Sequence, residues 1–116
     1  MTTRTTEGAT EQARERVFSS IAAVAREIGA EKAILFGSYA RGTETSRSDI
    51  DVVFIQETDA RFVERPAHAM ELLHDLLHGR GIDVIVYTPG EFERMSRASN
   101  LFVRRLKAEG KVVYES

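Results

Sequence analysis

The stretch that decides the fold is Phe36-Gly37-Ser38-Tyr39-Ala40-Arg41-Gly42, which a short polar run links to Ser48-Asp49-Ile50-Asp51-Val52-Val53-Phe54. Because side chains alternate across a β-strand, we expect Asp49 and Asp51 to point to the same face. Two parallel carboxylates repel each other unless a cation lies between them, and their oxygens suit Mg²⁺, which usually stays bound to substrate phosphates. A Gly-Ser turn offers backbone N–H groups to such phosphates. The stretch therefore predicts a nucleotide-and-metal site.

The composition limits what such a site can serve. A chain of 116 residues has the length of one domain with one core. Its formal net charge of -2 argues against a general nucleic-acid binder, so we expect no direct nucleic-acid binding. The absence of cysteine excludes a disulfide framework and a cysteine nucleophile. No apolar run is long enough to cross a membrane and the polar start is no signal peptide, so we expect a cytoplasmic protein.

The spacing of apolar residues predicts an α/β domain, with a small mixed sheet flanked by helices. We expect residues 1–8 to be a flexible tail and residues 9–116 to form a single domain. The first helix is expected from about Ala9 to Gly29, on a stripe formed by Val17, Ile21, Val24 and Ile28. The expected strands are Lys32 to Phe36, Asp49 or Ile50 to Gln56, Ile82 to Tyr87, and an edge strand from Lys111 to Tyr114. The other expected helices are a turn within residues 37–42, a helix over residues 66–78, and one last helix from Thr88 to Gly110.

A third carboxylate, Asp83, opens the expected strand over residues 82–87. If that strand lies beside the one that Asp49 opens, Asp83 joins Asp49 and Asp51 on one face. Three converging carboxylates can hold two cations about 4 Å apart, which is the two-metal arrangement for displacement at phosphorus. The alternative is that all three residues only solvate the ends of strands. Aspartate is disfavoured in strands, so the pair downstream of a Gly-Ser turn favours a functional site.

The turn itself supplies candidate phosphate ligands. Ser38 could donate its hydroxyl to a phosphate, and Gly37 has no side chain to block the approach. Arg41, or Arg47 in the following loop, could neutralise a polyphosphate. The alternative for these residues is an ordinary turn and solvated arginines. The turn is not a Walker A loop, because the Gly-x-x-x-x-Gly-Lys pattern is missing.

These residues resemble the motif of the DNA polymerase β-like nucleotidyltransferase superfamily, and most of all that of its minimal nucleotidyltransferases. The matching segments are Phe36-Gly37-Ser38, Asp49-Ile50-Asp51 and Ile82-Asp83-Val84. The resemblance implies the polymerase β-like fold, with Asp49 and Asp51 holding Mg²⁺ against a nucleoside triphosphate. It further implies that Asp83 completes a second metal site and helps to deprotonate the acceptor, while Ser38 and Gly37 bind the β- and γ-phosphates.

The resemblance also implies a partner and a reaction. Minimal nucleotidyltransferases often form the antitoxin half of a module with a HEPN-type ribonuclease toxin, and transfer AMP from ATP to a tyrosine of that toxin. The sequence leaves no residues for a separate acceptor domain, so we expect another molecule to present the acceptor. Two alternatives remain open: a non-catalytic antitoxin that neutralises its partner by occlusion, and a small-molecule nucleotidyltransferase acting, for example, on an aminoglycoside.

Overall fold

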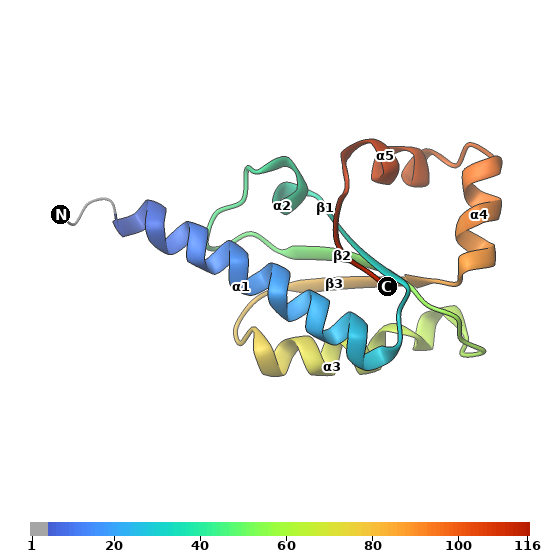
Figure 1. Cartoon of the computed structure of the whole chain (residues 1–116), viewed down its shortest axis with the longest axis horizontal. Helices are drawn as coiled ribbons and strands as arrows, with labels where there is room; N and C mark the ends of the chain where they lie inside the picture. Colours follow the sequence, from blue (N-terminus) through green and yellow to red (C-terminus); the bar gives the residue numbers. More distant parts are fainter. Residues whose placement is uncertain (1–4) are drawn as a thin grey trace.

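The computed structural model describes residues 5–116, which form helices around one four-stranded sheet (Figure 1). The strands lie in the order β3-β2-β1-β4; β1 is antiparallel to β2 and β4, whereas β2 and β3 are parallel. The predicted mixed sheet, with its last strand at an edge, is therefore confirmed. The elements are α1 (Thr5–Ile28), β1 (Lys32–Phe36), α2 (Ser38–Arg41), β2 (Ile50–Ile55), η1 (Phe62–Glu64), α3 (Pro66–Leu76), β3 (Ile82–Tyr87), α4 (Pro89–Arg97), α5 (Leu101–Glu109) and β4 (Lys111–Glu115).

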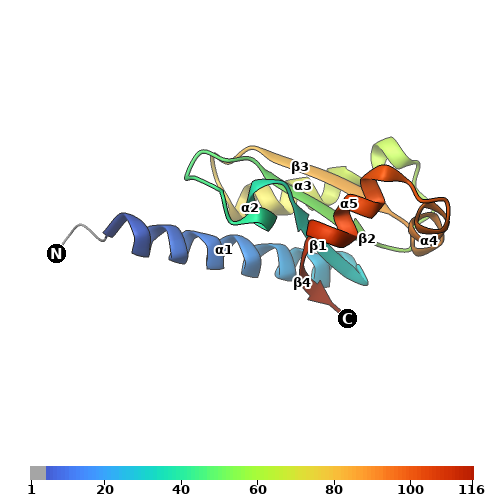
Figure 2. The same ribbon diagram turned by 90° about the horizontal axis from the view of Figure 1, so that it is seen from above.

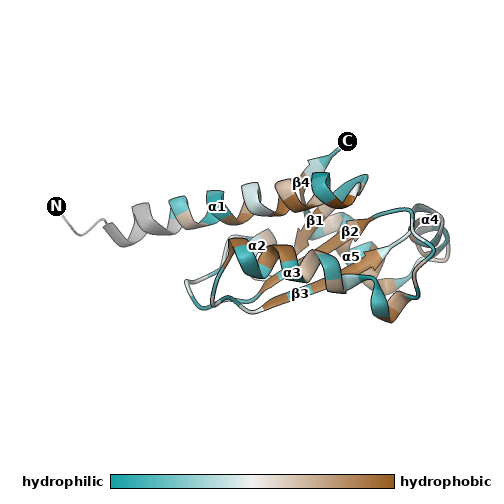
Figure 3. Cartoon of the chain, turned by 90° about the horizontal axis from the view of Figure 1, so that it is seen from below, coloured by the Kyte–Doolittle hydropathy of each residue, from teal (hydrophilic) through white to brown (hydrophobic). Residues whose placement is uncertain are grey.

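Helices cover both faces of the sheet, and the hydrophobic residues concentrate on the strands between them (Figures 2 and 3). The α1 and α3 helices pack on the face that carries Val52 and Phe54. The α4 and α5 helices contribute Phe92 and Leu106 to the opposite face, where they meet Val53. The alternation predicted for β2 is therefore confirmed, and Asp51 belongs to the face that α4 and α5 cover.

Two boundaries of the first and third helices differ from those expected. The α1 helix begins at Thr5 rather than near Ala9, and residues 1–4 of the expected tail lie outside the described residues. The α3 helix ends at Leu76, two residues before the expected end. Neither difference changes the strands that carry the candidate site.

The expectation of a single last helix is wrong. The segment forms two helices, α4 and α5, because Ser99 adopts a left-handed conformation with φ 58° between them. Asn100 then starts α5 by accepting a hydrogen bond from the Val103 amide on its side-chain oxygen at 3.0 Å. The apolar residues keep helical spacing through this break, so periodicity alone did not reveal it.

An ion pair joins α4 to the start of α3. Arg65 Nη1 donates to Glu91 Oε1 at 2.7 Å and Arg65 Nη2 donates to Glu91 Oε2 at 3.1 Å. The Arg65 side chain is 9% exposed and that of Glu91 is 31% exposed. Glu91 also closes a capping box with Thr88, and these hydrogen bonds, from Arg65 first, lower its pKa to about 2.

We expect Glu91→Gln to lower the free energy of unfolding at pH 7 by about 1–2 kcal/mol, because it leaves a buried guanidinium without its counter-charge. A depressed carboxyl pKa stabilises the fold above the unfolded value near 4.5 and loses that contribution as pH falls toward 2. The difference between the variant and wild type should therefore shrink between pH 4.5 and pH 2 in urea titrations. The matched control is Glu93→Gln on the same helix, where the pair with Arg97 is solvent-exposed, and it should change nothing. A pH-independent difference would contradict the assignment.

Candidate active site

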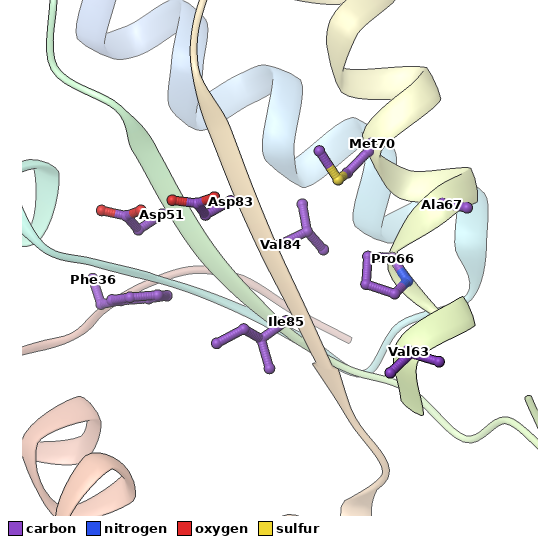
Figure 4. Close-up of a pocket in the computed structure, with 9 residues that line it drawn as sticks. All are labelled: Phe36, Asp51, Val63, Pro66, Ala67, Met70, Asp83, Val84 and Ile85. Carbon is purple, nitrogen blue, oxygen red and sulfur yellow. The ribbon is translucent and has the colours of Figure 1, made fainter. Parts of the chain in front are cut away.

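Two carboxylates meet where β2 and β3 begin. Asp51 and Asp83 are direct partners in the parallel register, and Figure 4 shows their carboxylates side by side. Burial raises the pKa of Asp51 to about 6, helped by a hydrogen bond with Asp83 and by the charges of Asp83 and Asp49. The ionised form of Asp51 is therefore disfavoured beside Asp83 when no cation neutralises it. The predicted pairing of β3 with β2 and the convergence of Asp83 with Asp51 are confirmed.

Gly37 borders the carboxylate of Asp51. Its φ of 73° lies in the left-handed region, and a Cβ built at this position would come within 2.6 Å of Asp51 Oδ2. Both the conformation and the close approach require glycine here. The Gly-Ser turn is thus held directly against the carboxylate that the sequence places with it.

Asp49 lies just before β2, next to the backbone of Gly81. The Ile50 amide donates to the Gly81 carbonyl at 2.8 Å, and a Cβ at Gly81 would overlap Asp49 Oδ1. Within the part of the chain that the structure describes, no three His, Asp or Glu side chains form a group that could hold a metal. The structure thus brings Asp51 and Asp83 together, while the convergence of Asp49 with them stays a prediction.

Of the other predicted phosphate ligands, Arg41 lies beside α5. Ser38 is half-buried and opens α2, and Arg41 is exposed at its end. Arg41 and Gly37 border a small cavity of about 180 Å³, whose other lining residues are Phe36, Phe102, Arg105, Leu106 and Glu109. Arg47 lies in the exposed loop, where its amide donates to Thr45 Oγ1. Arg41 therefore borders the cavity beside the Gly-Ser turn, whereas Arg47 lies in the exposed loop that follows. The phosphate-binding roles of both arginines stay predictions.

Arg80 was not identified from the sequence. Its Nη2 donates to the Tyr39 hydroxyl at 2.6 Å and to the Ser48 carbonyl at 2.7 Å, and its guanidinium lies over the Tyr39 ring. Tyr39 belongs to the Gly-Ser turn, and Ser48 directly precedes Asp49. One side chain thus ties together the segments that carry Ser38, Asp49 and Asp83.

A groove of about 640 Å³ runs from the carboxylates across β3 to α3 (Figure 4). We call it the β3-edge groove. Its lining residues are Phe36, Asp51, Val63, Pro66, Ala67, Met70, Asp83, Val84 and Ile85.

Among residues 5–116, no helix combines the length and the hydropathy needed to cross a membrane.

The fold and the carboxylates at the strand ends define a class. Residues 20–112 match the family described as "Nucleotidyltransferase domain", so the chain belongs to that family and is a nucleotidyltransferase. A Methanocaldococcus jannaschii protein named "Putative protein adenylyltransferase" is 37% identical over 86 residues, which are 72% of this chain and 78% of that protein.

Solved structures share the fold. A crystal structure of a "putative nucleotidyltransferase" from Sulfolobus solfataricus gives a TM-score of 0.57 at 22% identity, over 90% of this chain and 85% of the other. A crystal structure described as a toxin-antitoxin with AMP-PNP gives 0.63 at 21% identity, over 85% of this chain and 73% of the other. The predicted nucleotidyltransferase fold is therefore confirmed.

Gly81 provides a test of the Asp49 position. We expect Gly81→Ala to reduce nucleotidyl transfer by about 10- to 100-fold, because the new methyl group must displace the Asp49 carboxylate. Gly79→Ala is the matched control: its φ of 74° strains an alanine, but nothing lies within 4 Å of the added Cβ. This control should lose about 1 kcal/mol of stability and keep its activity. Initial rates and urea titrations of both variants measure the two effects, and equal activity losses would contradict the role of Asp49.

Proposed function

We propose that this nucleotidyltransferase transfers AMP from ATP to a hydroxyl, a tyrosine in our proposal, of a HEPN-type toxin, and so acts as a cytoplasmic antitoxin. The observation that carries the proposal is the Asp51–Asp83 pair against the Gly37 turn. The relative named as a protein adenylyltransferase and the toxin-antitoxin structure with AMP-PNP support the donor and the kind of partner.

The donor set fits Mg²⁺. Asp51 and Asp83 are direct partners in the register of β2 and β3, and the carboxylate of Asp51 is partly withdrawn from water, so a divalent cation would relieve their repulsion. Asp51 and Asp83 would hold the ion, and we propose that Asp49 joins them as a ligand. When bound, Mg²⁺ would neutralise phosphate charge and polarise the α-phosphorus toward attack.

The chain's own residues would then position the reactants. The backbone at Gly37, the Ser38 hydroxyl and the Arg41 guanidinium would hold the β- and γ-phosphates. The acceptor oxygen forms a bond to the α-phosphorus while the bond from that phosphorus to the bridging oxygen breaks, and pyrophosphate leaves with the electron pair. Asp83 takes the proton of the acceptor hydroxyl. Positioning and charge stabilisation supply the rate enhancement, without a covalent intermediate on the protein.

The test uses the protein together with its native partner. The two chains are co-purified, Mg-ATP is added, and both intact masses are measured. We expect an adenylyl increment on the partner that is absent with Asp51→Asn. Tight binding without any increment on either chain would contradict the proposal and support neutralisation by occlusion.

A further inference from the structure

The lining of the β3-edge groove restricts what can dock beside the carboxylates. Among the side chains that the structure describes, seven of the nine that line the groove are apolar, and the two charged ones are Asp51 and Asp83. A polycationic small molecule such as an aminoglycoside would need further carboxylates, and a nucleic-acid strand would need lysine or arginine. Neither kind of group lines the groove. Its chemistry is complementary to an uncharged, partly apolar protein segment.

The sheet leaves one edge of β3 open at this groove. The strand order places β3 at an end of the sheet. The Gly81 carbonyl accepts from the Ile50 amide and the Tyr87 carbonyl accepts from the Gln56 amide, so alternate residues from Gly81 bond to β2. Because backbone groups alternate along a strand, those of the residues between them point away from β2.

At one end of β3, an outward backbone carbonyl has a hydrogen-bond partner. Arg65 Nη1 donates to the Val86 carbonyl at 3.1 Å and so closes the edge there. The outward groups of Ile82 and Val84 have no partner strand within the part of the chain that the structure describes. Unpaired strand edges are templates for another extended segment. The free portion of the edge flanks Asp83.

Exposed apolar side chains border the same edge. Val63 is 75% exposed and Phe62 is 48% exposed, both in η1. Figure 4 shows Val63, Pro66 and Met70 on the opposite side of β3 from Asp51 and Asp83. A segment lying along β3 would therefore meet carboxylates on one of its faces and apolar side chains on the other.

We propose that the acceptor enters as an extended protein segment that pairs with the outer edge of β3 at Ile82 and Val84. Its hydroxyl side chain then faces Asp83, and the residues directly before and after it face Val63 and Met70, because side chains alternate along the added strand. The acceptor motif is accordingly a tyrosine between two apolar residues. This inference rests on the proposed function, and it specifies the substrate of the same site.

Peptides test the motif. Two seven-residue peptides carry one central tyrosine, flanked by valine in one and by serine in the other, and AMP transfer from labelled ATP is measured for both. We expect KM to be at least about tenfold lower for the valine-flanked peptide. N-methylation of those peptide amides that would face β3 should abolish transfer, and N-methylation of the alternate amides should not. Equal KM values for the two peptides, or equal effects of both methylation patterns, would overturn the inference.

A matched pair of protein variants tests the place. Val63→Asp should raise KM for the valine-flanked peptide about tenfold, because it puts a charge against the apolar flank. The control is Val112→Asp, which should leave that KM unchanged. Val112 is 49% exposed and lies on β4, at the opposite end of the sheet from β3. Both residues are exposed, and circular dichroism checks the fold of each variant. An unchanged KM with Val63→Asp, or an equal rise with both variants, overturns the inference.

A reaction without peptide separates this inference from the proposed function. Slow hydrolysis of Mg-ATP to AMP and pyrophosphate, with water as the acceptor, reports the chemistry alone. If wild type neither binds nor hydrolyses Mg-ATP, the proposed function fails and the inference falls with it. If hydrolysis occurs but neither peptide is modified, only the inference is overturned. If an aminoglycoside is modified instead of the peptides, both the inference and the proposed function are overturned. A stable dimer that the peptide cannot displace, and in which neither peptide is modified, would also overturn the inference, since a second copy would then cover the edge.

Discussion

Asp51→Asn is expected to reduce AMP transfer by at least about 1,000-fold and at the same time to stabilise the fold. The loss of transfer follows because Asp51 would supply the charge on which both the proposed metal site and the pair with Asp83 depend. The gain in stability follows because the ionised carboxylate is half-buried beside Asp83 and is repelled by the charges of Asp83 and Asp49, a cost that asparagine removes. We expect a catalytic carboxylate of this kind to lower the stability of the fold when it is ionised, because functional sites hold groups with shifted pKa values.

The sign of the stability effect depends on pH. The pKa of Asp51 rises from 3.8 to about 6, so the folded protein holds a proton there that the unfolded chain releases. Ionised Asp51 therefore destabilises the fold above pH 6. Without Mg²⁺, Asp51→Asn should gain about 1–2 kcal/mol at pH 8, with screening by solvent included, and close to nothing at pH 4.

Urea titrations in EDTA at the two pH values measure the stability effect, and labelled ATP measures transfer. The matched control is Asp59→Asn in the exposed connector after β2, which should change neither quantity. Retained transfer, or a loss of stability at pH 8, would show that Asp51 is a structural residue and not part of a catalytic carboxylate pair.

The sequence predicted the strands because they depend on short-range alternation, and it predicted the Asp51–Asp83 pair on the condition that β3 lies beside β2. Asp51 and Val53 alternate with Val52 and Phe54 along one strand, and this parity fixes which face each side chain occupies. The break at Ser99 escaped prediction because its left-handed φ carries no periodic signal.

The contacts around the site could not be read from local patterns. Arg80 is 41 residues from Tyr39 and 32 residues from Ser48 in sequence, so only the folded sheet brings them together. An arginine that follows a helix is ordinarily exposed to solvent, so nothing in the sequence assigned Arg80 a role at the site. The close approach of Gly81 to Asp49 has the same origin, because it depends on the parallel register of β2 and β3.

Arg80→Met is expected to lower kcat by about 100-fold, with a smaller effect on KM for ATP. Methionine keeps much of the packing over Tyr39 but cannot donate to the Tyr39 hydroxyl or the Ser48 carbonyl. The Gly-Ser turn and the loop before Asp49 then lose the bond that holds them in register. Misplacing reacting groups by about 1 Å costs a factor of about 100 in rate. KM for ATP changes less, because the other contacts to the nucleotide persist.

Two further variants separate positioning from general stability. Arg80→Lys can donate to both acceptors from its ammonium group, as Nη2 does, but it is shorter and lacks the planar guanidinium that lies over the Tyr39 ring, so it should restore only part of kcat. Tyr39→Phe removes one of the two hydrogen bonds and should cost a few-fold in kcat, less than Arg80→Met does. Arg97→Met, which removes an exposed arginine paired only with Glu93, should leave kcat and Tm unchanged. If Arg80→Met lowers Tm but has the wild-type kcat at temperatures well below that Tm, then Arg80 stabilises the fold without positioning the reacting groups. A loss of kcat at full stability, partly rescued by lysine, requires that Arg80 hold the Gly-Ser turn and Asp49 in the geometry that transfer needs.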